Sequence, residues 1–423
     1  MKFFKIFVLT TLTALTAISC FTIDKVLNNA PTKVNIDKNA KVLFNEDISQ
    51  IMLESNPDKP HYPLGLQAQF DIEYAGAFRV YVKNNASTSS YAVGVLGYNP
   101  KNNSIFMAGH AHHNAIAEFR IPDVLSFEDS AKNIPNATVL QNYVTLLDDT
   151  RNDKITGMLA YGDSLLVTSE IWYDGNGKNK DNLQVLNIND ISEKPKGMLQ
   201  FNGAARIAGY MSKIPINMQT ALGGKYLVGW SSVFAITSRH SQGPSLAVFS
   251  PQDALDTDLL VANDIKQVYP IYKGDLVAGA HKYTGKPASP IWSALAKGRY
   301  GFIIPKTSTF MVVGSQGGIH SGIGYKIIQE GKNKACAGGC TNDPKDNYNY
   351  YWLFDTNEML ENENPWDLKP FSYGKWRMPF SGSILGATFD DNNNMLYMSI
   401  SSAARTGNYD RPPMIVAYKI AVK

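Results

Sequence analysis

Short apolar segments separated by polar turns run from about residue 65 to the C-terminus. In the first clear unit, an apolar segment containing glycine (residues 94–98) precedes a turn at 100–103. A second apolar segment, 105–109, then leads through a short loop to a third, 116–121. Apolar runs of this length, bounded by Pro, Asn and Gly, are typical of β-strands. The pattern therefore predicts an all-β domain over residues 65–423.

The three-segment unit recurs along the chain, which indicates a repeat architecture. The second copy has segments at 157–161, 165–169 and 183–188. The third starts at 207–210, carries an insertion, and resumes at 234–238 and 246–249. The fourth has segments at 301–304, 310–314 and 351–354, and the fifth at 386–389, 396–399 and 415–420.

Each copy except the last is followed by a further β-type stretch, at 139–147, 198–201, 268–272 and 368–373. Five copies of three strands plus a fourth resemble the blades of a β-propeller. The resemblance rests on the pattern and not on a WD or kelch signature. It implies five blades, with segment 68–82 supplying the missing strand of the last blade and closing the ring. Six or seven blades, a β-sandwich and a two-domain β protein are the alternatives.

The N-terminus has the pattern of a secretion signal. Lys2 and Lys5 precede an uncharged apolar stretch, residues 6–18, that is short for a membrane span. The following Ala17-Ile18-Ser19-Cys20 resembles the lipobox of bacterial lipoproteins. This resemblance implies a signal peptide at 1–19 and acylation of Cys20. Phe21, where retained inner-membrane lipoproteins usually have Asp, implies the outer membrane, facing the periplasm or the cell surface. Plain cleavage, giving a soluble periplasmic or secreted protein, is the alternative.

Composition refines this interpretation. Residues 20–64, rich in Asn, Asp, Lys and Pro, resemble a tether. With Cys20 acylated, Cys336 and Cys340 remain as a pair that can form a disulfide in an oxidising compartment.

Removing residues 1–19 lowers the formal net charge from +3 to +1. A chain so near neutrality, without a run of Lys or Arg, is not expected to bind nucleic acid.

Propeller geometry places the loops between second and third strands on one face, together with the connections between blades. These loops hold most of the polar candidates. We expect a ligand-binding face there that includes Arg239, His240, Gln316, His320 and Arg405. His281, on the long connection 273–300, belongs to the same region, so six of the seven histidines gather there and only His61 lies elsewhere.

The densest cluster is His110-Ala111-His112-His113. On an extended chain His110 and His112 point the same way, so these histidines could share a divalent metal such as zinc, completed by His240 or His320. Hydrogen bonding of the rings to loop carbonyls is the alternative. Glu170, at the end of a second strand, is the candidate catalytic carboxylate. Its alternative is a salt bridge to Arg239 or Arg405.

Several enzyme classes find no support. The sequence has no G-x-S-x-G or H-E-x-x-H motif. Furanosidase-type glycoside hydrolases, which are five-bladed propellers, need carboxylates at the starts of several first strands. Here the expected first residues of those strands are not acidic; they are Tyr91, Lys154, Arg206, Tyr300 and Ser383. One carboxylate, that of Asp153, lies next to such a start. The favoured function is therefore a binding or interaction protein that takes a small molecule, glycan or protein. The alternative is a metal-dependent hydrolase.

Overall fold

The computed structural model describes most of the predicted domain. The described residues are 70–148, 150–173, 179, 181–202, 207–229, 244–257, 259–261, 283–362 and 368–422. Outside them lie the predicted signal segment, Cys20 and the tether 20–64, as well as Arg239, His240, His281 and the predicted strands at 234–238 and 268–272. Among the helices of the described part, none has the length and apolar character needed to cross a membrane.

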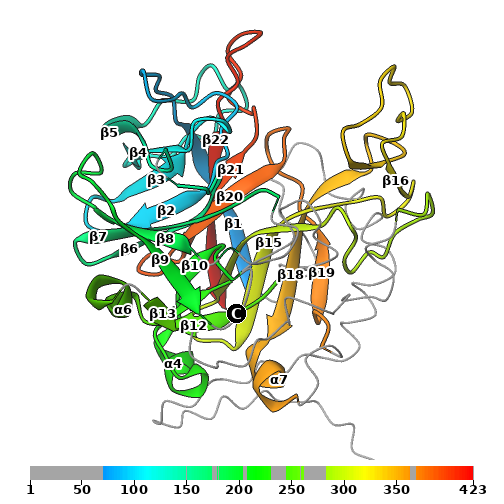
Figure 1. Cartoon of the computed structure of the whole chain (residues 1–423). Helices are drawn as coiled ribbons and strands as arrows, with labels where there is room; N and C mark the ends of the chain where they lie inside the picture. Colours follow the sequence, from blue (N-terminus) through cyan, green and yellow to red (C-terminus); the bar gives the residue numbers. More distant parts are fainter. Residues whose placement is uncertain are drawn as a thin grey trace, which may run out of the picture. The chain divides into compact units, whose positions relative to one another are not determined.

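The described residues form mainly small antiparallel sheets (Figure 1). The first sheet contains β2 (Leu96–Asn99), β3 (Ser104–Ala108), β4 (Ala115–Arg120) and β5 (Thr138–Thr145). The second contains β6 (Lys154–Tyr161), β7 (Ser164–Glu170), β8 (Asp181–Asn187) and β9 (Lys196–Asn202). The third contains β10 (Met211–Lys213), β11 (Tyr226–Val228) and β12 (Ala247–Phe249).

The remaining large sheets follow the same plan. The fourth contains β14 (Lys297–Ile303), β15 (Thr309–Gly317), β18 (Asn347–Asp355) and β19 (Ser372–Lys375). The fifth contains β20 (Ile384–Asp390), β21 (Met395–Ile400), β22 (Met414–Val422) and β1 (Phe70–Arg79). The strands named so far pair antiparallel with their neighbours and, apart from β1, in chain order. Meanders of this kind, four-stranded in all but the third of these sheets, are the sheets of propeller blades, so the chain has a propeller-type fold.

The N-terminal strand completes the last sheet. β1 pairs antiparallel with β22 from Phe70 opposite Val422 to Arg79 opposite Met414, with one bulge before Gly76. The predicted segment 68–82 therefore supplies the strand that the fifth copy lacks. Aromatic residues line this pairing: the half-buried Tyr74 contacts the buried Tyr418, with ring centroids 5.7 Å apart.

The third sheet departs from the prediction. Its second strand is β11, at Tyr226–Val228, within the stretch that the sequence pattern treats as an insertion. The reason is local: α4 (Ile216–Leu222) and its left-handed cap Gly223 separate β10 from β11, so no tight turn joins the two strands. A three-residue strand after a helix has too few residues to show an alternating pattern.

A second departure is β13 (Leu259–Val261), which pairs parallel with β9 and extends the second sheet to five strands. It follows the short helix α6 (Pro251–Asp256). Another short helix, α7 (Thr356–Glu361), follows β18, and the Asp355 side chain caps it by accepting a hydrogen bond from the backbone of Asn357.

Neighbouring sheets contact one another through their first strands. β2 contacts both β6 and β20, β14 contacts both β10 and β20, and β10 contacts β6. Glycines permit the closest approaches. A Cβ added at Gly157 would lie 1.9 Å from the carbonyl oxygen of Gly209, and one at Gly386 would lie 2.4 Å from that of Gly94. Both positions exclude any larger residue unless the backbone shifts.

Hydroxyl groups join these first strands. Thr156 in β6 donates a hydrogen bond to the carbonyl of Ala208, just before β10 (2.7 Å). Ser212 in β10 donates to the carbonyl of Gly301 in β14 (3.0 Å). These bonds satisfy backbone carbonyls on the side of a first strand where no further strand pairs with it.

Side-chain hydroxyls also connect the fifth sheet to the fourth and to the first. The Tyr300 hydroxyl in β14 accepts a hydrogen bond from the backbone N–H of Phe389 in β20 (3.3 Å). Thr388 in β20 accepts one from the backbone N–H of Tyr98 in β2 (2.9 Å). Each bond ties one sheet to the next without adding a strand.

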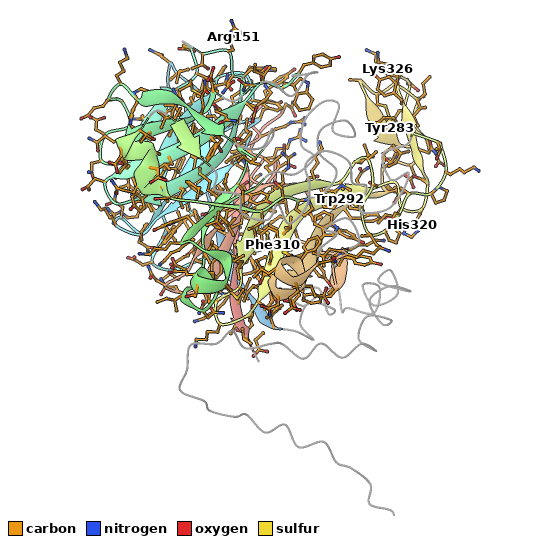
Figure 2. All side chains as sticks on the ribbon, turned by 60° about the horizontal axis from the view of Figure 1, so that its bottom comes forward. Arg151, Tyr283, Trp292, Phe310, His320 and Lys326 are labelled. Carbon is orange, nitrogen blue, oxygen red and sulfur yellow. A yellow bond between two sulfur atoms is a disulfide. The ribbon has the colours of Figure 1, made fainter. Side chains whose placement is uncertain are left out.

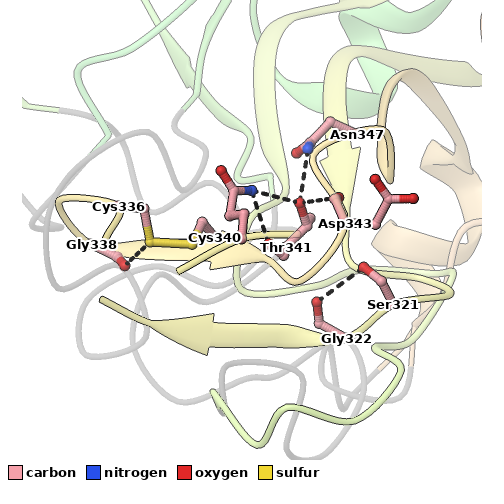
Figure 3. The surroundings of a disulfide bond; sticks show 9 residues. Ser321, Gly322, Cys336, Gly338, Cys340, Thr341, Asp343 and Asn347 are labelled. Atoms are coloured by element: carbon pink, nitrogen blue, oxygen red, sulfur yellow. Dashed lines mark hydrogen bonds between the residues drawn. A yellow bond between two sulfur atoms is a disulfide. The ribbon is translucent and has the colours of Figure 1, made fainter. Parts of the chain in front are cut away.

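An insertion between β15 and β18 carries a small hairpin, β16 (Ile323–Tyr325) and β17 (Gly339–Thr341), which stands out from the sheets (Figure 1). The predicted disulfide is present: Cys336 and Cys340 are bonded, with their Cα atoms 6.5 Å apart (Figure 3). Next to it, the Thr341 hydroxyl donates to the carbonyl of Asp343 and accepts from the side-chain amide of Asn347. In Figure 2, Tyr283 and Lys326 lie on this outer part, whereas Trp292 and Phe310 are buried in the sheet core.

Glu118, in β4, is a fully buried carboxylate surrounded by neutral donors. It accepts hydrogen bonds from Asn99 at the end of β2, from the hydroxyl of Ser104 in β3, and from Gln141 in β5. Asn102, in the turn between β2 and β3, donates a fourth. A single side chain thus joins all four strands of the first sheet.

We expect Glu118→Ala to lower the free energy of unfolding by about 3 kcal/mol, because several buried donors lose a charged acceptor together. Glu118→Gln should lie between the wild type and Glu118→Ala, since its amide places one donor against the other donors. The exposed Glu128→Ala is the control and should change stability by less than about 0.5 kcal/mol. Denaturant unfolding followed by circular dichroism measures all three, and equal stability of Glu118→Ala and Glu128→Ala would contradict this role.

Candidate functional site

The candidate loops lie at the same end of their sheets, the end where the first strand begins. His110 lies opposite Ala92, which precedes the first strand of its sheet, and Glu170 lies opposite Lys154, where β6 begins. The backbone N–H of Ser401 donates to the carbonyl of Ser383, just before β20. In each of these sheets, the loop after the second strand therefore sits beside the start of the first strand.

The three neighbouring histidines gather in one group. The rings of His110 and His113 stack with centroids 4.4 Å apart, and the ring of His112 lies 5.5 Å from that of His110. His110 Nδ1 accepts a hydrogen bond from the backbone N–H of His112, and His113 Nδ1 lies 3.2 Å from the hydroxyl of Ser87. Burial, with the neighbouring His113 and His112, lowers the pKa of His110.

This packing does not make a metal site by itself. Within the described ranges, no three His, Cys, Asp or Glu side chains are placed to hold a metal ion. Nδ1 of His110 faces a backbone N–H and Nδ1 of His113 faces a hydroxyl, so neither of these contacts is the bond to a loop carbonyl that the alternative expects. His240 lies outside the described residues, so a metal at this group stays a prediction.

Tyr91 joins the histidine loop to a second candidate loop. Its backbone N–H donates to the carbonyl of Arg411, and its own carbonyl accepts from the N–H of Ala111. Its ring contacts that of His110, with centroids 6.0 Å apart, and the guanidinium of Arg411 lies 5.9 Å from its ring centroid. Segment 87–91, to which sequence reasoning assigned no ligand role, is thus the bridge between two predicted parts of the face.

The backbone of Tyr91 is unusual. Its φ is 55°, in the left-handed region that bulky residues rarely adopt, and 44% of its side chain is exposed. Strain of this kind costs about 1–3 kcal/mol and persists where the surroundings enforce it, often at binding sites. Burial does not explain the ring's position, since nearly half of it faces solvent.

The second loop, residues 401–411, is held internally and anchored to segment 87–91. Asp410 accepts from the hydroxyl of Ser90 (2.8 Å) and from that of Thr406 (3.1 Å). Arg405 donates to the carbonyl of Gly407 and to Asn408. These contacts hold Arg405 within its own loop, and the loop presents Tyr409 with 86% of its surface exposed.

Glu170 is buried in a network of amides. It accepts hydrogen bonds from the side chains of Asn179 and Asn182, each at 3.2 Å. Asn179 also donates to Asn152, which reaches the carbonyls of Ser169 and Asp181. Arg239 lies outside the described residues, so the alternative of an ion pair to it stays a prediction. Through its bonds to these neutral amides, Glu170 holds the end of β7 against the loop that follows.

Gln316 and His320 take different positions. Gln316 is buried and accepts hydrogen bonds from the N–H and hydroxyl of Ser293, so it anchors the segment before β14. His320 is exposed, and its Nε2 lies 3.3 Å from Nζ of Lys375. Lys375 also sits over the ring of Tyr348, 3.8 Å from its centroid. Of these two candidates, only His320 can meet an external ligand directly.

Sequence reasoning missed two cations. It starts the fourth copy near Tyr300, whereas β14 begins at Lys297 and includes Arg299. β14 pairs Lys297 with Ser315 and is bulged between Gly298 and Tyr300, so Arg299 is the extra residue of the bulge. The apolar pattern begins only after this bulge, and for that reason it marked the strand's start too late.

Comparison with known proteins gives only weak likenesses. No family model matches the chain, and no curated protein matches it. Among solved structures, it is similar to hydrazine synthase of Kuenenia stuttgartiensis (7% identity, TM-score 0.31), covering 76% of this chain and 59% of that one. It is similar to the PQQ-bound aldose sugar dehydrogenase of Streptomyces coelicolor (11%, TM-score 0.36; 84% and 99% covered) and to the WD40 repeats of RRP9 (11%, 0.31; 84% and 100%). Likenesses this weak carry no argument about function.

Proposed function

We propose that this protein is an exported, lipid-anchored binding protein. In this proposal it is a five-bladed propeller whose loop face holds a small molecule, glycan or protein. The observation that carries the proposal is Tyr91, an exposed ring held in a strained conformation where two loops of this face meet.

The contacts between first strands support five blades around a common axis. Each first strand contacts those of two other sheets, and following these contacts leads from β2 through β6, β10, β14 and β20 back to β2. The pairing of β1 with β22 supports closure of the ring by the N-terminal strand. In such a ring, loops beside the starts of the first strands surround one end of the axis.

The chemistry of the Tyr91 cluster suits a ligand with a ring and polar substituents. An exposed tyrosine ring offers a stacking surface and a hydroxyl. Around it stand the imidazoles of His110 and His112 and the guanidinium of Arg411, which supply hydrogen-bond donors. We infer that a sugar ring or a peptide side chain suits this combination of a stacking ring and donors.

We expect Tyr91→Gly to lose ligand binding while keeping the fold. Glycine adopts the left-handed backbone without a Cβ penalty, so relief of strain offsets the lost ring contacts. Saturation-transfer difference NMR against oligosaccharides and short peptides measures binding in both proteins, and thermal unfolding checks the fold. The matched control is Tyr283→Gly, an equally exposed tyrosine beside the hairpin, which should bind as the wild type does. Equal transfer in wild type and Tyr91→Gly, or none in the wild type, would contradict the proposal.

The second candidate function is a metal-dependent hydrolase, favoured by the gathering of three imidazoles. Its metal, zinc or a similar divalent ion, would be held by His110, His112 and His113, with Glu170 as general base. Elemental analysis of purified protein tests it against a His110→Ala, His112→Ala double variant. A metal at full occupancy that disappears in the double variant would favour the enzyme. We expect less than half an equivalent in both, which would exclude it.

The proposed anchor is Cys20. Metabolic labelling with a fatty-acid analogue should mark the wild-type protein and leave Cys20→Ala unlabelled, because acylation requires that thiol. Cys336→Ala with Cys340→Ala is the control and should label as the wild type does. An unmodified mature N-terminus in the wild type would make the protein a soluble exported one and overturn the anchor alone.

A further inference from the structure

Two cations share the start of one first strand without a partner of opposite charge. Lys297 and Arg299 both lie in β14, on either side of Gly298, and both are partly enclosed by the protein. Nε of Arg299 is buried and has no hydrogen-bond partner. No carboxylate among the described residues forms an ion pair with either side chain.

The electrostatics of the pair agree with this geometry. Burial, together with the neighbouring Arg299, lowers the pKa of Lys297 to about 8. Burial alone lowers the pKa of Arg299 to about 10. Each positive charge is therefore less favourable here than in water, and half-buried charges without an ion pair often mark a functional site.

Arg299 is the extra residue of a bulge that recurs near the start of two other first strands. β6 and β20 are bulged at the same point, with Thr156 and Leu385 as the extra residues. Thr156 uses its hydroxyl to bond the next sheet, and Leu385 contacts Gly94. Arg299 makes no such inter-sheet bond among the described residues, although it occupies the same register position. Its guanidinium is thus not needed to join sheets.

We propose that Lys297 and Arg299 form a binding site for an oxyanion, a carboxylate or phosphate group of a small ligand. A guanidinium and an ammonium two residues apart offer a fork of donors and a point charge, the combination that recognises such groups. The inference rests on the proposed function in one respect, that the starts of the first strands belong to the ligand face. It needs neither the histidines nor the lipid anchor.

Isothermal titration calorimetry with citrate and with inorganic phosphate, at constant ionic strength, tests the site. We expect Arg299→Met and Lys297→Met each to weaken binding at least tenfold. Exposed cations provide the matched controls: Arg151→Met and Lys332→Met should bind as the wild type does. Stronger binding of citrate would assign the site to carboxylates, and stronger binding of phosphate to phosphate esters.

Two further readouts separate binding from a structural role. Without ligand, Arg299→Met should unfold at the wild-type temperature or above, because methionine removes a half-buried charge that has no ion pair. Citrate affinity should fall as the pH rises from 7 to 9, since Lys297 loses its proton near pH 8, and this fall should vanish in Lys297→Met. A marked loss of stability in Arg299→Met would instead indicate a structural cation and overturn the inference.

The outcomes also separate this site from the proposed function. If neither anion binds the wild type while Tyr91-dependent ligand binding is present, the inference fails and the function stands. If anion binding depends on Arg299 and no ligand depends on Tyr91, the inference stands and the Tyr91 site fails. Anion binding unchanged in both β14 variants would overturn the inference whatever Tyr91 does.

Discussion

The pairing of β1 with β22 is the constraint on which the rest of the described structure depends. It joins residues 70–79 to residues 414–422, so the last sheet is complete only when both ends of the chain have met. Without β1, the backbone groups of β22 would form an unprotected strand edge. Contacts this distant in sequence form late, because closing so long a loop costs conformational entropy before any pairing compensates for it. The last sheet therefore depends on the position of the N-terminal strand.

Many polar groups in the interior join strands and sheets. Hydroxyls of Thr156, Ser212 and Tyr300 satisfy the free edges of first strands and fix the spacing of neighbouring sheets. Glu118 joins four strands in the same manner within one sheet, with amides and a hydroxyl as its partners. Such groups must be satisfied when buried, because each unpaired one is costly. Nε of Arg299 in β14 is one of the buried polar atoms of the described residues that find no partner. Together with Lys297 and with the strained backbone and exposed ring of Tyr91, Arg299 lies at the end of the sheets where the first strands begin.

The sequence predicted part of the composition of this end of the sheets. The sequence pattern brought His110, Glu170 and residues 401–405 to the ends of second strands, and the register places His110 and Glu170 opposite the starts of first strands. It could not show that Gln316 turns inward to Ser293, because burial depends on what packs above the strand. Nor could it show that Tyr91 bridges two loops, since the partner loop is more than 300 residues away. Lys297 and Arg299 were hidden by a bulge, which interrupts the alternation from which strands are recognised.

By itself, the sequence determined the β class, the repeated three-segment units, the Cys336–Cys340 disulfide and the use of segment 68–82 in the last sheet. The β class and the repeated units follow from local apolar periodicity, which a chain carries in any conformation. The disulfide follows from the pairing of two closely spaced cysteines in an oxidising compartment, and the use of segment 68–82 from the resemblance to a closed propeller. Only the tertiary structure decided the second strand of the third sheet, the parallel addition of β13 and the partners of each buried polar group. These depend on which distant segments meet, and the free energy of such contacts lies in the packing between sheets. A linear pattern does not contain that information.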